Sequence, residues 1–178
     1  TLDAIGKMYG ITRERVRQIE NYAINSIRKA DAYKTEKATF TELEELLHSL
    51  GGIVVEDDLL QLTAKDSATQ NHIHFLLTIG EGFKKRKEDE HFKHRWHVSD
   101  DLARKVEESL HKLYSGLDNE DLLPEAEMIS DFLKHLEEVS EKYKNQEVVK
   151  RWLSLTKKID KNALGEWGAA HSPNIKTK

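Results

Sequence analysis

The sequence contains no cysteine and only two prolines among its 178 residues. The lack of cysteine excludes disulfide bonds, thiolate metal sites and a cysteine nucleophile, and it is compatible with a reducing compartment. No apolar run approaches the roughly 20 residues that a membrane-spanning helix requires. We therefore expect a soluble, cytoplasmic protein that makes no membrane contact.

The sequence also lacks an excess of positive charge, because 28 lysine and arginine residues stand against 32 acidic residues and the formal net charge is -4. This excludes a uniformly basic surface, so any contact with nucleic acid must come from a local patch. The charge is unevenly distributed: residues 1–37 carry a net +3, residues 38–123 a net -8 and residues 124–178 a net +1. A basic head on an acidic body predicts two different kinds of partner.

Two helices are predicted in the basic head, residues 1–30. Gly10 separates a first apolar-periodic segment from a second helix that runs from Thr12 to about Ala30, with Thr12 as its N-cap. One side of this second helix is aliphatic and is expected to be buried; it consists of Val16, Ile19, Ala23, Ile27 and Ala30. A helix, a glycine turn and a longer helix form the helix-turn-helix layout.

The opposite side of the second helix carries Arg13, Glu14, Arg17 and Gln18. Arginine can donate two hydrogen bonds to guanine, glutamine can pair with adenine, and glutamate can accept from cytosine. Thr12 and the free amides at the helix start would face a phosphate. These side chains suit the major groove of DNA, although any exposed helix carries charges on its outer face.

The segment "TLDAIGKMYGITRERVRQIENYAINSIRKA", residues 1–30, resembles the helix-turn-helix of region 4 of bacterial primary-type sigma factors, which reads the promoter −35 element. The resemblance implies base reading by Arg13, Glu14, Arg17 and Gln18, and phosphate contacts by Thr12 and Arg15. It also implies promoter-like double-stranded DNA, and RNA polymerase, as partners. The two helices that precede this pair in a full region 4 are not in the sequence, and nothing after residue 30 resembles other parts of a sigma factor.

Residues 31–39 are predicted to be a linker, and residues 40–123 a winged-helix-like domain. The pair Thr41 and Glu44 has the spacing of a capping box and predicts a helix start there. Residues 83–98 alternate as a β-hairpin does, with Phe92, His94, Trp96 and Val98 on one side and Lys93, Arg95 and His97 on the other. Helices followed by a two-stranded hairpin are the layout of a winged helix.

The hairpin is the basic part of this acidic domain, because residues 84–95 hold six basic and three acidic residues. A wing of this kind can lie along phosphates, which gives Lys84, Lys85 and Arg86 as candidate phosphate contacts. The alternative is that "KKRK" pairs across the hairpin with "EDE".

Residues 124–178 are predicted to form a helical unit, starting at Pro124, with an irregular C-terminal tail from Asn162. Residues 155–178, with "GEWG" at their centre, resemble the lead-in to HARE-HTH winged-helix domains. This resemblance implies that the tail leads to a missing domain. Because the sequence starts at Thr1 rather than methionine, we expect it to be a piece of a longer protein.

Nine histidines raise the alternative of a metal site. In a strand, however, His91 and His97 would point away from the face that carries His94, so the three cannot converge on one ion. We also find no grouping of nucleophile, base and orienting acid. No metal, cofactor, small-molecule substrate or enzymatic activity is therefore expected.

The sequence thus predicts a mainly α-helical protein with a helix-turn-helix, a winged-helix-like unit with a small β-hairpin wing, and a further helical unit. The predicted function is sequence-specific DNA binding in transcription, coupled to RNA polymerase. Two alternatives remain: a protein-interaction module that binds polymerase or a regulator, and the DNA-targeting arm of a restriction-type nuclease.

Overall fold

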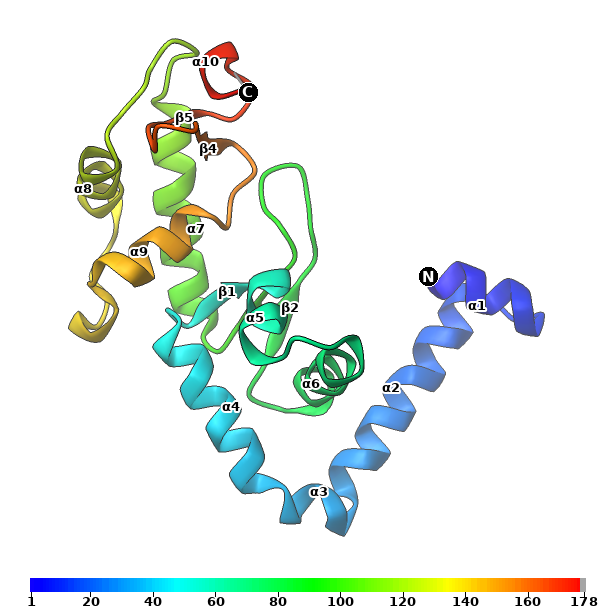
Figure 1. The fold of residues 1–178 in the computed structure, drawn as a ribbon. Helices are drawn as coiled ribbons and strands as arrows, with labels where there is room; N and C mark the ends of the chain where they lie inside the picture. The colour runs from blue at the N-terminus through cyan, green and yellow to red at the C-terminus, as the bar shows by residue number, and fades with distance from the viewer. Residues whose placement is uncertain (177–178) are drawn as a thin grey trace.

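The basic head forms the two predicted helices, α1 (Leu2–Tyr9) and α2 (Arg13–Lys29). In the computed structural model, which describes residues 1–176, the head projects away from the rest of the chain, with α2 as a long arm and α1 at its tip (Figure 1). Gly10 ends α1 in the left-handed conformation (φ 66°), where glycine has no steric penalty. The predicted helix-turn-helix is confirmed.

A helical elbow joins α2 to the body. The segment predicted to be a linker contains α3 (Asp31–Thr35) and the start of α4 (Lys37–Ser49). Two long-range hydrogen bonds tie the end of α2 and the elbow to the end of α6 and the turn that follows it: Arg28 Nε donates to the Ile79 carbonyl (2.7 Å), and Glu81 N–H donates to the Tyr33 hydroxyl (3.2 Å). The direction of α2 is therefore set by contacts with the body.

The predicted capping box is wrong, because the N-cap position of α4 is Glu36, five residues before Thr41. Thr41 lies inside α4, where its hydroxyl donates to the carbonyl of Lys37 (3.0 Å) instead of accepting from an N–H group at a helix start. A threonine hydroxyl can bond to the preceding turn of a helix, so its presence does not fix a helix start.

The body continues with a winged-helix-like unit around a three-stranded antiparallel sheet in the order β1-β3-β2. Its elements after α4 are β1 (Ile53–Val55), α5 (Glu56–Thr63), α6 (Ser67–Ile79), β2 (Lys84–Arg86), β3 (Arg95–His97) and α7 (Asp100–Ser115). Lys84 pairs with His97 and Arg86 with Arg95, so the hairpin forms as predicted. The mainly helical fold with a small hairpin wing is confirmed.

The central strand β3 is buried on both faces. Trp96 packs into a core with α4, α5 and α6, whereas Arg95, only 3% exposed, points to the opposite face and pairs with Glu107 of α7. The alternation in the sequence places Trp96 and Arg95 on opposite sides correctly, but it is wrong for Phe92, which lies in the core on the Arg95 side because the strand begins only at Arg95. Both sides are covered, because helices lie on both faces of the small sheet.

The C-terminal part of the body consists of α8 (Glu125–His135), a 3₁₀ turn (Glu141–Tyr143), α9 (Gln146–Leu153), β4 (Ile159–Lys161), β5 (Trp167–Ala169) and α10 (Pro173–Lys176). The prediction of an irregular tail from Asn162 is wrong, since β4 and β5 pair as an antiparallel hairpin. Two strands of three residues each are too short to leave a readable alternation in the sequence. Residues 177–178, the end of the predicted lead-in, lie outside the described residues.

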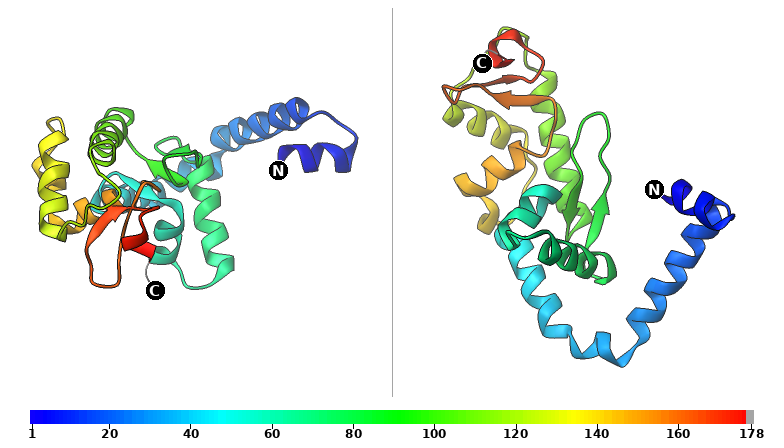
Figure 2. Two further views of the ribbon diagram at one scale, coloured as in Figure 1. Left: turned by 90° about the horizontal axis from the view of Figure 1, so that it is seen from above. Right: turned by 45° about the vertical axis from the view of Figure 1, so that its right-hand side comes forward.

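One large core joins the winged-helix-like unit to the C-terminal segment. Phe132 and Trp152 are fully buried beside residues of α7 and β1, and Trp152 Nε1 donates to the carbonyl of Gly51 (3.0 Å). The wing is also bonded to this segment, because Lys157 N–H donates to the carbonyl of His91 (2.8 Å). Figure 2 shows α8, α9 and the C-terminal hairpin packed together beside α7. The predicted domain boundary at residue 123 thus separates two segments that share a core.

Within residues 1–176, no helix combines the length and the apolar character that crossing a membrane would require.

Candidate nucleic-acid interface

The start of α2 is open to solvent and is capped by Thr12. The Thr12 hydroxyl accepts from the N–H of Arg15 (3.1 Å), and both residues are exposed. The first N–H groups of a helix have no partner within the helix and carry a partial positive charge. This end of α2 therefore has the local structure to which a phosphate oxygen can bind.

The four candidate base-reading residues of α2 are all exposed. The Arg13 side chain is 64% exposed and lies 3.9 Å from a carboxylate oxygen of Asp3 in α1. Sequence reasoning missed Asp3, because nothing in the spacing indicates that α1 turns back toward Arg13. The pair is long and solvated, so it leaves Arg13 free to exchange partners.

Arg17 and Glu14 form a two-pronged ion pair on the same exposed face. Arg17 Nε and Nη2 donate to the two carboxylate oxygens of Glu14 at 2.9 and 2.6 Å. These hydrogen bonds hold the pKa of Glu14 below its usual value and raise the pKa of Arg17. Because the Arg17 side chain is 51% exposed, the pair is accessible from outside, and a base edge can replace Glu14 as the acceptor.

Gln18 lies one turn after Glu14 along α2. Its amide oxygen accepts a hydrogen bond from Arg15 (3.4 Å). The structure therefore places Arg13, Glu14, Arg17 and Gln18 on the accessible surface of the first two turns of α2. Thr12 lies at the end of that surface. The acceptors that hold Arg13 and Arg17 also lie at the surface, so neither guanidinium is locked into the interior.

The contact between α1 and α2 depends on Gly6. The Gly6 carbonyl accepts from the N–H of Ile11 (2.9 Å), and Gly6 is buried. A methyl group added at Gly6 would lie 2.6 Å from the backbone oxygen of Ile11. A glycine inside a helical pattern is the sequence signal for such a close approach, and it was present at this position.

The predicted burial of the aliphatic side of α2 is largely wrong. Val16 is buried beneath α1, but Ile19 is 47% exposed, and Ala23 and Ala30 are exposed as well. The physical reason is that α1 covers only the first turns of α2, while the elbow contacts only its last turn. A two-helix head has too little surface to bury more.

Replacing Gly6 by alanine is expected to disrupt the helix-turn-helix without unfolding the body. The new methyl group meets backbone rather than a flexible side chain, so the turn at Ile11 must shift. We expect faster hydrogen exchange of the α1 and Ile11 amides and loss of DNA binding, with an unchanged melting transition of the body. Lys7→Ala, at the next and exposed position, is the matched control. Exchange rates unchanged by Gly6→Ala would contradict the assignment of the close contact.

The three candidate phosphate contacts of the wing are each paired with a carboxylate. Lys84 binds Asp100 (2.7 Å), Lys85 binds Glu56 (2.9 Å) and Arg86 binds Glu107 (3.0 Å); these are the wing ion pairs. The hydrogen bond from Lys84, followed by that from His97, lowers the pKa of Asp100 to about 2. The alternative of pairing with "EDE" across the hairpin is wrong for these three residues, since their partners come from α5 and α7.

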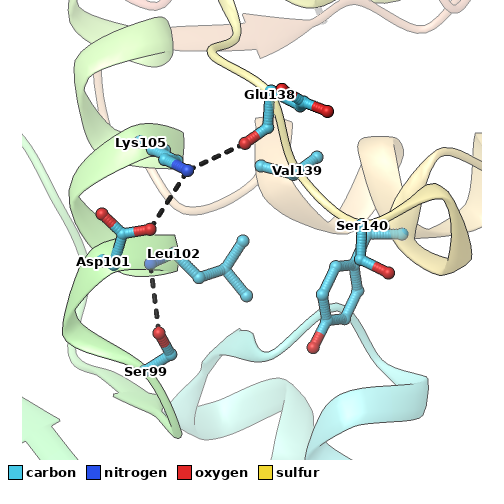
Figure 3. Close-up of a pocket in the computed structure, with 8 residues that line it drawn as sticks. Ser99, Asp101, Leu102, Lys105, Glu138, Val139 and Ser140 are labelled. Carbon is cyan, nitrogen blue, oxygen red and sulfur yellow. Dashed lines mark hydrogen bonds and ion pairs between the residues drawn. The ribbon is translucent and has the colours of Figure 1, made fainter.

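A cleft of about 420 Å³ opens at the start of α7, between that helix and residues 138–143. Figure 3 shows that its polar groups bond to one another: Lys105 bridges Asp101 (3.1 Å) and the carbonyl of Glu138 (2.8 Å), and Ser99 caps α7. Among residues 1–176, no group of three or more histidine and acidic residues is placed to hold a metal ion.

The family model described as Sigma-70, region 4 matches residues 1–29, which are α1, the turn and α2. The match supports a sigma-factor-like, DNA-binding helix-turn-helix in this part of the chain. No curated protein and no solved structure matches the sequence.

Proposed function

We propose that the chain is a sequence-selective DNA-binding protein of transcription that reads a −35-like promoter element through α2. The observation that carries the proposal is the exposed set Arg13, Glu14, Arg17 and Gln18 on the first turns of a capped helix. This helix lies in the segment that matches sigma-70 region 4. Its donors and acceptors suit base edges in the major groove.

Binding would begin with the backbone of the duplex. Thr12 and the open N-terminus of α2 would contact one phosphate and Arg15 another, which fixes the position of the helix in the groove. Arg17 would then exchange Glu14 for the N7 and O6 atoms of a guanine, and Glu14 would become available to a cytosine amino group. The role proposed for the protein is therefore non-enzymatic.

The body would act as the frame that holds α2 and couples it to RNA polymerase. Its acidic middle segment, net -8 over residues 38–123, is repelled by DNA and suits a basic protein surface. The wing ion pairs support this division of roles, because the cations of β2 are already neutralised by Glu56, Asp100 and Glu107.

The test is fluorescence anisotropy with labelled duplexes that carry either a −35-like hexamer or a scrambled hexamer of the same composition. We expect tighter binding to the first duplex, with an affinity for both that falls steeply as salt increases. Equal affinities at every salt concentration would rule out base reading by α2.

A second candidate function is a protein-interaction module whose acidic body binds polymerase or a regulator while the head does not bind DNA. The wing ion pairs also favour this function. A pull-down with core RNA polymerase in the absence of DNA separates the two proposals. Capture that is lost when acidic residues of α7 are reversed in sign, together with no affinity for any duplex, would favour the second.

A further inference from the structure

A cluster of lysines lies where the tip of the wing meets the C-terminal segment. These lysines line a cleft of about 400 Å³. Its charged lining residues are Lys93, Lys150, Lys157, Lys161 and Asp160. The rest of the lining includes Trp167, Thr156 and other small and aliphatic residues. We call this the lysine cleft. Figure 1 shows the wing loop beside the segment that leads into β4.

The lysine cleft is built by backbone contacts between two parts of the chain. The N–H of Lys93 in the wing donates to the carbonyl of Leu155 (3.0 Å), and the N–H of Lys157 donates to the carbonyl of His91 (2.8 Å). Thr156, which is buried, donates its hydroxyl to the same carbonyl (2.7 Å). The lysines are therefore held together by a defined fold rather than by chance proximity of long side chains.

Two of the four ammonium groups have carboxylate partners and two do not. Lys150 binds Glu125 (3.2 Å) and Lys157 binds Glu88 (3.1 Å). Within residues 1–176, the ammonium groups of Lys93 and Lys161 lie within ion-pair distance of no carboxylate; Lys161 instead lies over the ring of Trp167, 5.7 Å from its centroid. The lysine cleft thus offers two ammonium groups that no carboxylate of the described residues pairs, while Asp160 is the acidic residue of its lining.

Trp167 supplies an aromatic ring to the same lining. Its side chain is buried, and its Nε1 has no hydrogen-bond acceptor among the residues that the structure describes. Because Trp167 lines the lysine cleft, its indole N–H signal can report on binding there.

The chain segment that lines most of the lysine cleft is rich in basic residues, of which Lys144 and Lys158 are paired with Glu141 and Glu90. Residues 142–161 contain seven lysine or arginine residues and only two acidic residues. A single small anion needs only a few donors, whereas a segment with repeated cations suits a polymer with repeated phosphates.

We propose that the lysine cleft binds a backbone phosphate of nucleic acid, independently of base sequence. Lysine is a compact point charge on a flexible stem, and it contacts phosphates without the paired geometry that reads bases. The site goes beyond the proposed function, because it does not depend on α2. It would add affinity for any duplex, and α2 would supply the selectivity.

The experiment uses the full chain and a labelled duplex that lacks the −35-like hexamer. Its variant is Lys93→Gln combined with Lys161→Gln, and its matched control is Lys65→Gln combined with Lys134→Gln, which removes the same charge from exposed positions outside the cleft. At about 0.1 M salt we expect the cleft variant to bind roughly tenfold more weakly, and the slope of log K against log salt to fall by about 2. The control should change binding less than about twofold.

Equal losses in the two variants, or no loss in the cleft variant, would overturn the proposal. The source of the phosphate is tested by titrating the protein with inorganic phosphate and following the Trp167 indole proton by NMR. The nucleic-acid assignment would be overturned if inorganic phosphate changes the chemical shift of the Trp167 indole proton while the cleft variant binds the duplex as well as the unmodified protein does. The preference for the hexamer over a scrambled sequence separates this site from α2: the cleft variant should keep that preference, even if overall affinity falls.

Discussion

Replacing Trp152 by alanine is expected to lower the free energy of unfolding of the body by about 3–5 kcal/mol, the usual cost of removing a large aromatic side chain from a packed core. Trp152 is fully buried, with ring centroids 5.8 Å from Phe132 and 6.1 Å from Tyr143. Its Nε1 also donates to the carbonyl of Gly51, which lies between α4 and β1. The substitution therefore removes packing contacts from both halves of the body, residues 40–123 and residues 124–178.

Chemical denaturation followed by circular dichroism measures this effect. Because the two halves share a core, we expect one transition that moves as a whole to lower denaturant concentration. Leu164→Ala is the control, since Leu164 is 84% exposed. Two separate transitions, of which only one shifts, would show that residues 40–123 and 124–178 unfold as independent domains.

Replacing Arg17 by alanine is expected to weaken binding to a −35-like duplex by roughly ten- to a hundred-fold and to relax selectivity at one base pair, because one bidentate base contact is lost. The loss also leaves the carboxylate of Glu14 without its partner, so an unpaired negative charge would face the duplex. Anisotropy titrations against hexamers that differ at single positions measure both effects.

Two further variants separate charge from base reading. Lys29→Ala removes one positive charge from the last turn of the same helix, so it should weaken binding to every duplex slightly and leave selectivity unchanged. Arg17→Lys keeps the charge but cannot form two parallel hydrogen bonds, so it should resemble the alanine variant in selectivity. If Arg17→Ala and Lys29→Ala behave alike on all duplexes, Arg17 does not read a base.

The sequence predicts best those features that short-range patterns determine. Gly10 marks the turn of the helix-turn-helix, Thr12 caps α2, and the alternation over residues 83–98 predicts the hairpin. The exposed positions of the four candidate base-reading residues also follow from helical periodicity alone, since three to four residues make one turn.

Features that depend on distant contacts could not be predicted in this way. The partners of the wing cations are Glu56, Asp100 and Glu107, which only the fold brings to β2. The periodicity of the aliphatic side of α2 matches that of a core helix, and it therefore predicts burial of that whole side. Periodicity cannot indicate how much of a helix a neighbour covers, and α1 covers only the part around Val16.

Because α2 contacts the described residues of the body only near its C-terminal end (Figure 1), a small rotation at that end produces a larger displacement at its N-terminal end. With 17 residues and a rise of about 1.5 Å per residue, α2 is roughly 25 Å long, so a rotation of about 10° at its base would move its reading end by about 4 Å. That displacement exceeds the spacing of about 3.4 Å between neighbouring base pairs. The hydrogen bonds from Arg28 to Ile79 and from Glu81 to Tyr33 lie at the base of α2 and oppose such a rotation.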